Sequence, residues 1–103
     1  MGRAVTIGAA IRARADDWTR TIPGVVEARG RGLLQGVKLD HAAGGRTPNR
    51  ALEVCRLAQE DGILLLAEGA QADVLAITPP AVITDAQLAR ALEGIERALR
   101  TTA

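Results

Sequence analysis

The sequence predicts an α+β domain with the order α-β-β-α-β-β-α, in which three helices pack against a small antiparallel or mixed sheet. Apolar residues recur at helical spacing near both ends of the chain and in its middle. Short apolar runs of strand length, bounded by glycine and proline, lie in pairs between these stretches. The chain has 103 residues and is 48% hydrophobic, which suffices for one domain, residues 1–103, with a buried core.

The first helix is expected over residues 3–21. Its apolar residues recur every three or four positions: Ala4, Ile7, Ile11, Ala15 and Trp18. Gly8 lies within this stripe and indicates a close contact with another helix or with the sheet. Pro23 and Gly24 end the element with strong turn chemistry. Because the helix begins almost at Met1, we expect that further chain once preceded it.

A β-hairpin is expected next. Its strands are residues 25–28 and 33–39, and the sequence RGRG at 29–32 is the expected turn. Gly36 interrupts the second strand and indicates a bulge or the close approach of another backbone. Residues 40–47 contain Gly44 and Gly45 and are expected to form a mobile loop.

The second helix is expected over residues 48–61. Thr47 suits its N-cap, Pro48 its first position and Gly62 its C-terminal cap. The expected inner face consists of Leu52, Cys55, Ala58 and Gln59, widened by Ala51, Val54 and Leu57.

Two further strands and a last helix complete the fold. Residues 63–66 and 74–77 are the expected strands, and residues 67–72 connect them. Pro79 and Pro80 end the second of these strands, because neither can donate a backbone hydrogen bond. Thr84 and Gln87 have the spacing of a capping box, so a helix is expected over 85–100. Its apolar stripe is Leu88, Leu92, Ile95 and Leu99.

Composition argues against several partners. Thirteen basic and twelve acidic residues nearly cancel, and Trp18 is the only aromatic residue, so nucleic-acid binding by charge or base stacking is not expected. No apolar run approaches the roughly 20 residues that span a bilayer. Since the lone Cys55 cannot form a disulfide within the chain, we expect a cytoplasmic protein.

Each residue that could carry chemistry has a simpler interpretation. His41, the only histidine, lies in an expected loop and suits a solvated side chain better than a catalytic one. Cys55 is either a nucleophile or, as its place on a helix face favours, a small core residue. Lys38 suits a solvent-facing strand position better than a Schiff base. The sequence RGRG is too short for a phosphate-binding loop and favours a turn. We therefore expect no catalytic, cofactor-binding or metal-binding residue in this chain.

Three segments together resemble the C-terminal small domain of class III aminotransferases, the pyridoxal-phosphate (PLP) enzymes that include 4-aminobutyrate, ornithine and acetylornithine aminotransferases. Residues 26–39, VEARGRGLLQGVKL, are similar to the family's hairpin V(R)GxGLxxGxxL. Residues 58–66, AQEDGILLL, match a helix end that runs into a GLLL strand. Residues 73–99 begin DVLAITPPAVIT and resemble the family's NVLRxxPPLxIT followed by a helix.

The resemblance implies the small domain of a fold type I enzyme that moves an amino group from an amino acid or ω-amine donor to a keto acid. It implies a homodimer that uses PLP. The large domain, which carries the PLP lysine in the family, is absent from these residues, and Lys38 does not match a family lysine. We therefore expect a truncated or excised part of an enzyme, which binds no PLP and is inactive alone.

The resemblance also marks one substrate-binding position as lost. Many family members have an arginine after NVL that binds a substrate carboxylate, and this chain has Ala76 there. The alternative to an enzyme fragment is a free-standing regulatory or subunit-interaction module without catalytic activity.

Overall fold

The computed structural model describes residues 2–40, 49–60, 62–63, 65–68, 73–80 and 82–103. Its helices are α1 (Gly2–Thr21), α2 (Arg50–Glu60) and α3 (Asp85–Thr101), and its strands are β1 (Val25–Arg31), β2 (Leu34–Leu39), β3 (Leu66–Glu68) and β4 (Val74–Ile77). This is the predicted order α-β-β-α-β-β-α, and the α+β fold class is confirmed. The expected loop over 40–47, with His41, Gly44 and Gly45, and the expected cap at Thr47 and Pro48 lie outside the described residues, Asp40 excepted.

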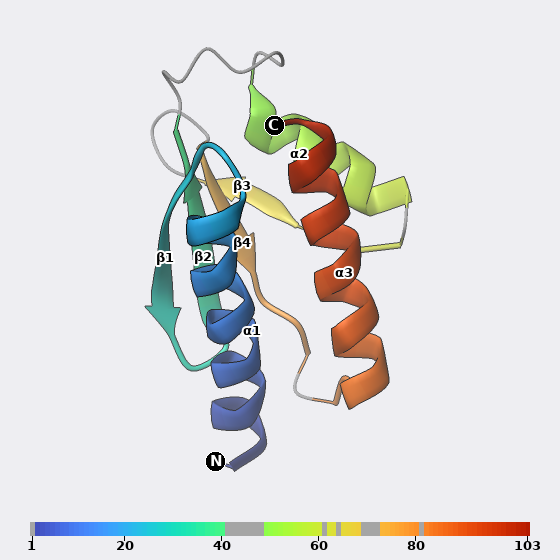
Figure 1. The fold of residues 1–103 in the computed structure, drawn as a ribbon. Coiled ribbons are helices and arrows are strands. Elements are labelled where there is room, and N and C mark those ends of the chain that lie inside the picture. Colours follow the sequence, from blue (N-terminus) through green and yellow to red (C-terminus); the bar gives the residue numbers. More distant parts are fainter. Residues whose placement is uncertain (1, 41–48, 61, 64, 69–72, 81) are drawn as a thin grey trace.

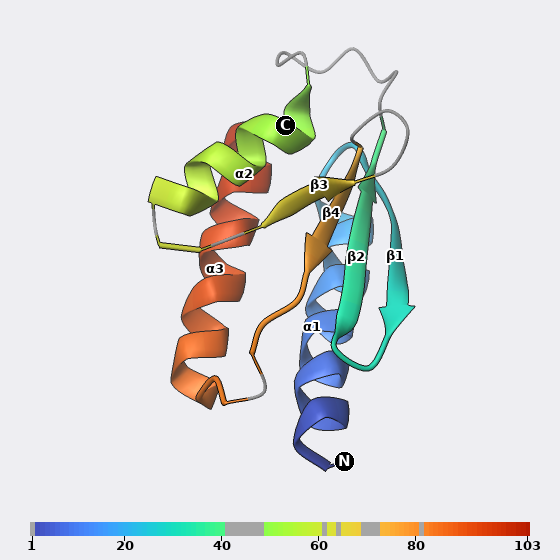
Figure 2. The ribbon, with the colours of Figure 1, turned by 180° about the vertical axis from the view of Figure 1, so that it is seen from behind.

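The four strands form one sheet in the order β1-β2-β4-β3, and every pair is antiparallel. Helix α1 packs on β1 and β2, α2 packs on β3, and α3 packs across both helices (Figure 1). Figure 2 views the molecule from the opposite side, where the strands lie in front of α1. The helices therefore cover one face of the sheet.

The strand register divides the side chains between the two faces. Ala28, Val37 and Leu75 lie side by side across β1, β2 and β4, and all three are buried in the core beneath the helices. The adjacent row is Arg29, Gly36, Ala76 and Leu66, and because successive residues of a strand point to opposite faces, it lies on the other side. We call this second side the open face.

Gly8 confirms the expected close contact of the first helix. A Cβ atom at this position would lie 2.0 Å from the Gly32 carbonyl oxygen, so α1 rests directly on the hairpin turn. The expected turn over 29–32 was placed too early. Gly30 pairs with Gln35 and Arg31 with Leu34, so β1 continues to Arg31 and only Gly32 and Leu33 form the turn.

Helix α2 ends at the predicted glycine and buries only part of the predicted inner face. Gly62 has φ +79°, its N–H donates to the Gln59 carbonyl, and the Ile63 N–H donates to the Ala58 carbonyl, which together form a Schellman motif. The buried residues of the helix are Ala51, Val54 and Ala58, whereas Leu52 is 49% exposed. The three buried residues all belong to the predicted inner face, which was too wide, because its members Leu52 and Gln59 are exposed.

Strand β3 begins later than predicted. The apolar run over 63–66 was assigned to a strand, but the strand pairs Leu66 with Ala76, Ala67 with Leu75 and Glu68 with Val74. Leu65 is buried before the strand, while Leu66 is 55% exposed on the open face. Pairing with β4, rather than the apolar run, decides which residues form β3.

The predicted start of the last helix is confirmed in detail. Strand β4 ends at Ile77 before the two prolines, and the Thr84 hydroxyl accepts from the Gln87 N–H at 3.1 Å. The Gln87 side chain accepts from the Thr84 N–H at 2.9 Å, which completes the capping box. The predicted stripe of Leu88, Leu92, Ile95 and Leu99 is buried.

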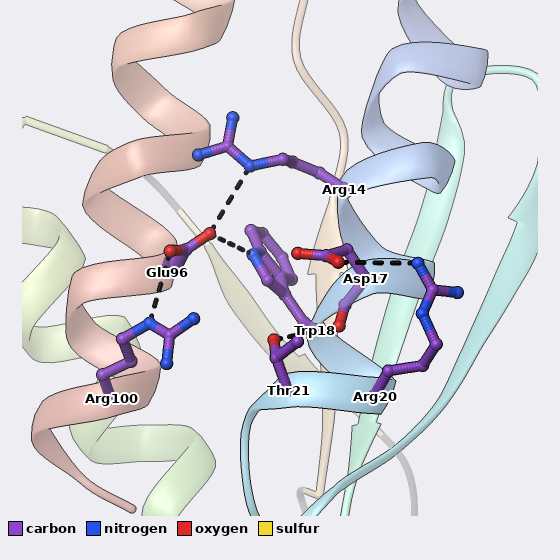
Figure 3. Close-up of polar contacts among 7 residues, drawn as sticks. All are labelled: Arg14, Asp17, Trp18, Arg20, Thr21, Glu96 and Arg100. Carbon is purple, nitrogen blue, oxygen red and sulfur yellow. Dashed lines mark hydrogen bonds and ion pairs between the residues drawn. The ribbon is translucent and has the colours of Figure 1, made fainter.

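A polar cluster joins α1 to α3 at the indole of Trp18, which is fully buried (Figure 3). The Trp18 Nε1–H donates to Glu96 Oε1 at 2.7 Å, and Arg14 and Arg100 approach the same carboxylate at 3.5 and 3.3 Å. The Trp18 hydrogen bond, with help from the two arginines, lowers the pKa of Glu96. One carboxylate thus satisfies the only polar atom of the largest core side chain.

Arg50 makes a second connection, at the C-terminal end of α3. Its guanidinium donates to the carbonyls of Pro23 and Leu99 at 2.7 and 2.8 Å and to the Thr102 hydroxyl at 3.0 Å. Partial burial lowers the pKa of Arg50, but the group remains a cation at any physiological pH. Arg50 therefore ties the start of α2 to the end of α3 and to the turn before β1.

Candidate ligand-binding site on the open sheet face

The open face holds a hollow of about 370 Å³ at the centre of the sheet. Its lining includes Arg29 from β1, Gly36 from β2, and Val74 and Ala76 from β4. Gly36 and Ala76 are neighbours across the strands and carry little or no side chain. The hollow therefore exists because the two central strands present almost no side-chain volume at this row.

Arg29 provides the positive charge of the hollow. It pairs directly with Gly36, and its Cγ lies 3.6 Å from the point that a Gly36 Cβ would occupy. The guanidinium donates to Glu27 Oε1 at 2.6 Å, and both side chains are about half exposed. Such an exposed ion pair contributes little free energy and is easily exchanged.

The opposite side of the hollow is negative. Glu68 lies on β3, the far edge strand, and belongs to the lining. Leu34 and Thr78 close the end nearest the hairpin turn. The hollow thus has a cation over β1 and β2, a carboxylate over β3, and an apolar floor between them.

The other candidate residues lie elsewhere. Lys38 is half-buried on β2, across from Glu27 and Val74, and does not line the hollow. Cys55 is half-buried on α2 and packs against the core, and burial raises the pKa of its thiol. A raised pKa leaves less thiolate, so the core interpretation of Cys55 fits better than the nucleophile. His41 lies outside the described residues.

A larger hollow, of about 510 Å³, lies between α3 and the proline segment. Its walls include Ile63, Leu65, Pro79 and Ile83, and Arg90 and Arg97 contribute its charged side chains. Within the described ranges no group of three or more His, Cys, Asp or Glu side chains could hold a metal ion. The described helices also include none that is long and apolar enough to cross a membrane.

The chain has relatives of known name, although no family model matches it. An alanine/serine racemase from Pyrococcus horikoshii is 33% identical over 99 residues, which are 96% of this chain and 21% of the racemase. A diaminobutyrate–2-oxoglutarate transaminase from Streptomyces anulatus is 39% identical over 75 residues, which are 73% of this chain and 16% of the transaminase. The chain therefore spans about a fifth of the length of these relatives.

Solved structures agree with the sequence relatives. A phospholyase from Arthrobacter in complex with phosphoethanolamine matches 100% of this chain with 25% of its own, at a TM-score of 0.87 and 27% identity. The ornithine aminotransferase from Toxoplasma gondii, whose active site holds PLP at partial occupancy, matches 97% of this chain with 22% of its own. Its TM-score is 0.75 and its identity 31%.

The fold and these matches first define a class, the PLP-dependent enzymes of aminotransferase fold type I. The sequence relatives, which also include acetylornithine and ornithine aminotransferases, then define the family. The chain belongs to the class III aminotransferases and corresponds to a small part of one.

The residues of this chain do not fit PLP itself. The cofactor is held in enzymes by a lysine Schiff base and by an acidic or arginine partner of the pyridine nitrogen. Lys38 is the only lysine of the chain, and it lies outside the lining of the hollow with Glu27 as its neighbour on β1. We therefore derive no chemical step through PLP on this chain.

Ala76, which the sequence marks only through the family resemblance, lines this hollow, and the hollow itself was not predicted. Arg29 was assigned to a turn, whereas the structure places it in a strand, opposite Gly36 and two strands from Ala76. The signal that could have placed Arg29 on this face is the alternation of side chains between the two faces along each strand. Arg29 and Ala76 share a face only once the register of β1, β2 and β4 is known.

Proposed function

We propose that residues 1–103 are the C-terminal small domain of a class III aminotransferase whose large PLP-binding domain lies outside this chain. One observation carries the proposal: the whole chain superposes on a quarter of a fold type I enzyme, at a TM-score of 0.87. The order of the three family-like segments, at 26–39, 58–66 and 73–99, supports the C-terminal placement. The parent enzyme is a homodimer, as the family resemblance implies, and a cytoplasmic protein, as the lone Cys55 leads us to expect.

The parent enzyme moves an amino group from an amino acid or ω-amine to a keto acid. PLP, bound by the large domain, supplies the electron sink for this chemistry. The present chain contributes one wall of the substrate site through its open face and is inactive alone. A transaminase is preferred to a racemase because most of the named relatives are aminotransferases, although the racemase matches 96% of this chain.

Ala76 marks what distinguishes this enzyme from many others in the family. The family's carboxylate-binding arginine would project from this position of β4 on to the open face. Alanine cannot provide a bidentate guanidinium contact. Either another group of the parent enzyme binds the substrate carboxylate, or the substrate has no carboxylate at that end.

Two experiments test the proposal. The genomic sequence upstream of the codon for Met1 is expected to continue in frame and to encode a PLP lysine, and an unrelated gene there would favour a free-standing interaction module. Incubation of the purified chain with PLP is expected to give no stoichiometric adduct that borohydride traps. A trapped adduct that disappears in Lys38→Arg would refute the predicted inactivity, because Lys38 is the only side-chain amine.

The uncovered face also predicts association of the isolated chain. Leu34 and Leu66 are 70% and 55% exposed on the open face, where the proposed large domain would pack. Apolar surface of this kind favours self-association at high concentration. Light scattering over a wide concentration range checks this, and a strict monomer throughout would count against it.

A further inference from the structure

We propose that Arg29 binds the oxyanion group of a small ligand in the hollow over Gly36 and Ala76. The proposal concerns a site on this chain, and it rests on the proposed function only for the identity of the ligand as a substrate of the parent enzyme. The hollow is lined by Arg29, Gly36 and Ala76 together. The strand register, rather than a turn or a loop, holds them in one row.

The geometry allows Arg29 to reach the ligand. Neighbouring strands lie about 4.8 Å apart, so the backbones of Arg29 and Ala76 are about 10 Å apart across β2. The Arg29 side chain already leans over β2, with its Cγ 3.6 Å from the Cβ position of Gly36. Because Gly36 has no side chain, nothing from β2 stands between the guanidinium and the space above Ala76.

The Arg29 guanidinium is available to a ligand because its ion pair with Glu27 is weak. Glu27 is on the same strand, and the side chains of Arg29 and Glu27 are 48% and 55% exposed. Exposed pairs of this kind contribute between about 0 and 1 kcal/mol. A ligand oxyanion can replace the Glu27 carboxylate without leaving a buried charge unpaired.

The chemistry of the hollow favours an oxyanion at the Arg29 end only. A guanidinium presents parallel N–H donors that match the two oxygens of a carboxylate or of a phosphate. Glu68 lies at the far side of the lining and repels a second anion there. The names of the relatives supply two probes: 2-oxoglutarate, whose second carboxylate Glu68 disfavours, and phosphoethanolamine, whose ammonium suits Glu68.

The experiment titrates the 103-residue chain with 2-oxoglutarate and, separately, with phosphoethanolamine. Amide shifts in ¹⁵N NMR spectra report binding, and saturable shifts are expected at Gly36 and Ala76. Arg29→Gln is expected to weaken binding by up to about fivefold, because an ion pair with a half-exposed guanidinium contributes at most about 1 kcal/mol. Arg29→Lys should restore part of the loss, because it keeps the charge without the fork.

Two matched variants sharpen the test. Arg31→Gln makes the same charge change on the same face of the same strand, outside the lining of the hollow, and should leave the affinity within about twofold. Glu27→Gln removes the competing carboxylate and should raise the affinity. Circular-dichroism melting curves confirm that each variant is folded.

The outcomes separate this inference from the proposed function. Binding of either anion that depends on Arg29 and not on Arg31 supports the proposed Arg29 site. The anion that binds more tightly then identifies the kind of oxyanion. No saturable shift with either anion, or equal losses in Arg29→Gln and Arg31→Gln, would overturn it. Neither result bears on the upstream reading frame, so the family proposal can fail or stand independently.

Discussion

The two faces of the sheet are built from the same strands and serve different purposes. On the helical face, Val37 and Leu75 are fully buried. One residue further along each strand, Lys38 and Ala76 are only half-buried on the open face. Burial of apolar area dominates folding stability, so the helical face carries most of it. The open face is correspondingly free to hold a charged hollow, and its residues can change with little effect on the fold.

The largest expected effect tests this division directly. Leu75→Ala leaves a cavity beneath the helices and should cost about 2–5 kcal/mol of unfolding free energy. Leu66→Ala removes the same atoms from the open face, where Leu66 is 55% exposed, and should change stability by no more than about 0.5 kcal/mol. Urea denaturation followed by far-ultraviolet circular dichroism measures both. Equal losses would mean that the open face is not open in solution.

A second test concerns the contact that seats α1 on the hairpin. Gly8→Ala places a methyl group against the backbone of Gly32, and we expect a loss of about 1–3 kcal/mol. The higher helix propensity of alanine, about 1 kcal/mol, acts in the opposite direction. Gly2→Ala is the matched control, because a Cβ there meets nothing within 4 Å. Similar stabilities of the two variants would show that α1 does not rest on the turn.

A smaller effect is expected at the start of α3, which holds the helical layer together. Thr84→Ala removes the hydroxyl that accepts from the Gln87 N–H and should cost about 1 kcal/mol. Thr84→Ser keeps the acceptor and should retain most of the stability. The same urea experiment distinguishes them, and a serine variant as unstable as the alanine variant would contradict the cap.

The smallest effect is a dependence of stability on pH at the α1–α3 contact. The Trp18 hydrogen bond lowers the pKa of Glu96 in the folded state. The stability that the ionised Glu96 contributes is therefore fully present above the ordinary glutamate pKa of about 4.3 and is lost as the pH falls through the folded pKa. The stability difference between the wild type and Glu96→Gln should therefore shrink on acidification. Glu93→Gln, an exposed position on the same helix, serves as the control. A difference that stays constant with pH would exclude this role for Glu96.

Features that depend on residues close together in the sequence could be predicted from the sequence. The capping box at Thr84, the glycine cap at Gly62 and the limits of β4 depend on a few neighbouring residues, and each was predicted correctly. The stripes of α1 and α3 were also correct, except that Ala4 is only half-buried.

The remaining features depend on contacts between distant segments. The run over 63–66 is apolar enough for a strand, yet pairing with β4 places β3 at Leu66–Glu68. The predicted inner face of α2 included both Val54 and Leu52, and of these two the packed structure buries only Val54. The candidate site combines Arg29, Gly36 and Ala76 from three strands. Only the register of the sheet brings them together, and no local pattern specifies it.

The buried indole of Trp18 gives this protein a natural optical reporter. Since the chain contains no other tryptophan and no tyrosine or phenylalanine, its near-ultraviolet absorption and its intrinsic fluorescence come from one ring. That ring lies between α1 and α3 and donates to Glu96. Separation of the two helices would expose it to water and shift its emission to longer wavelength, so opening of this contact can be followed without any label.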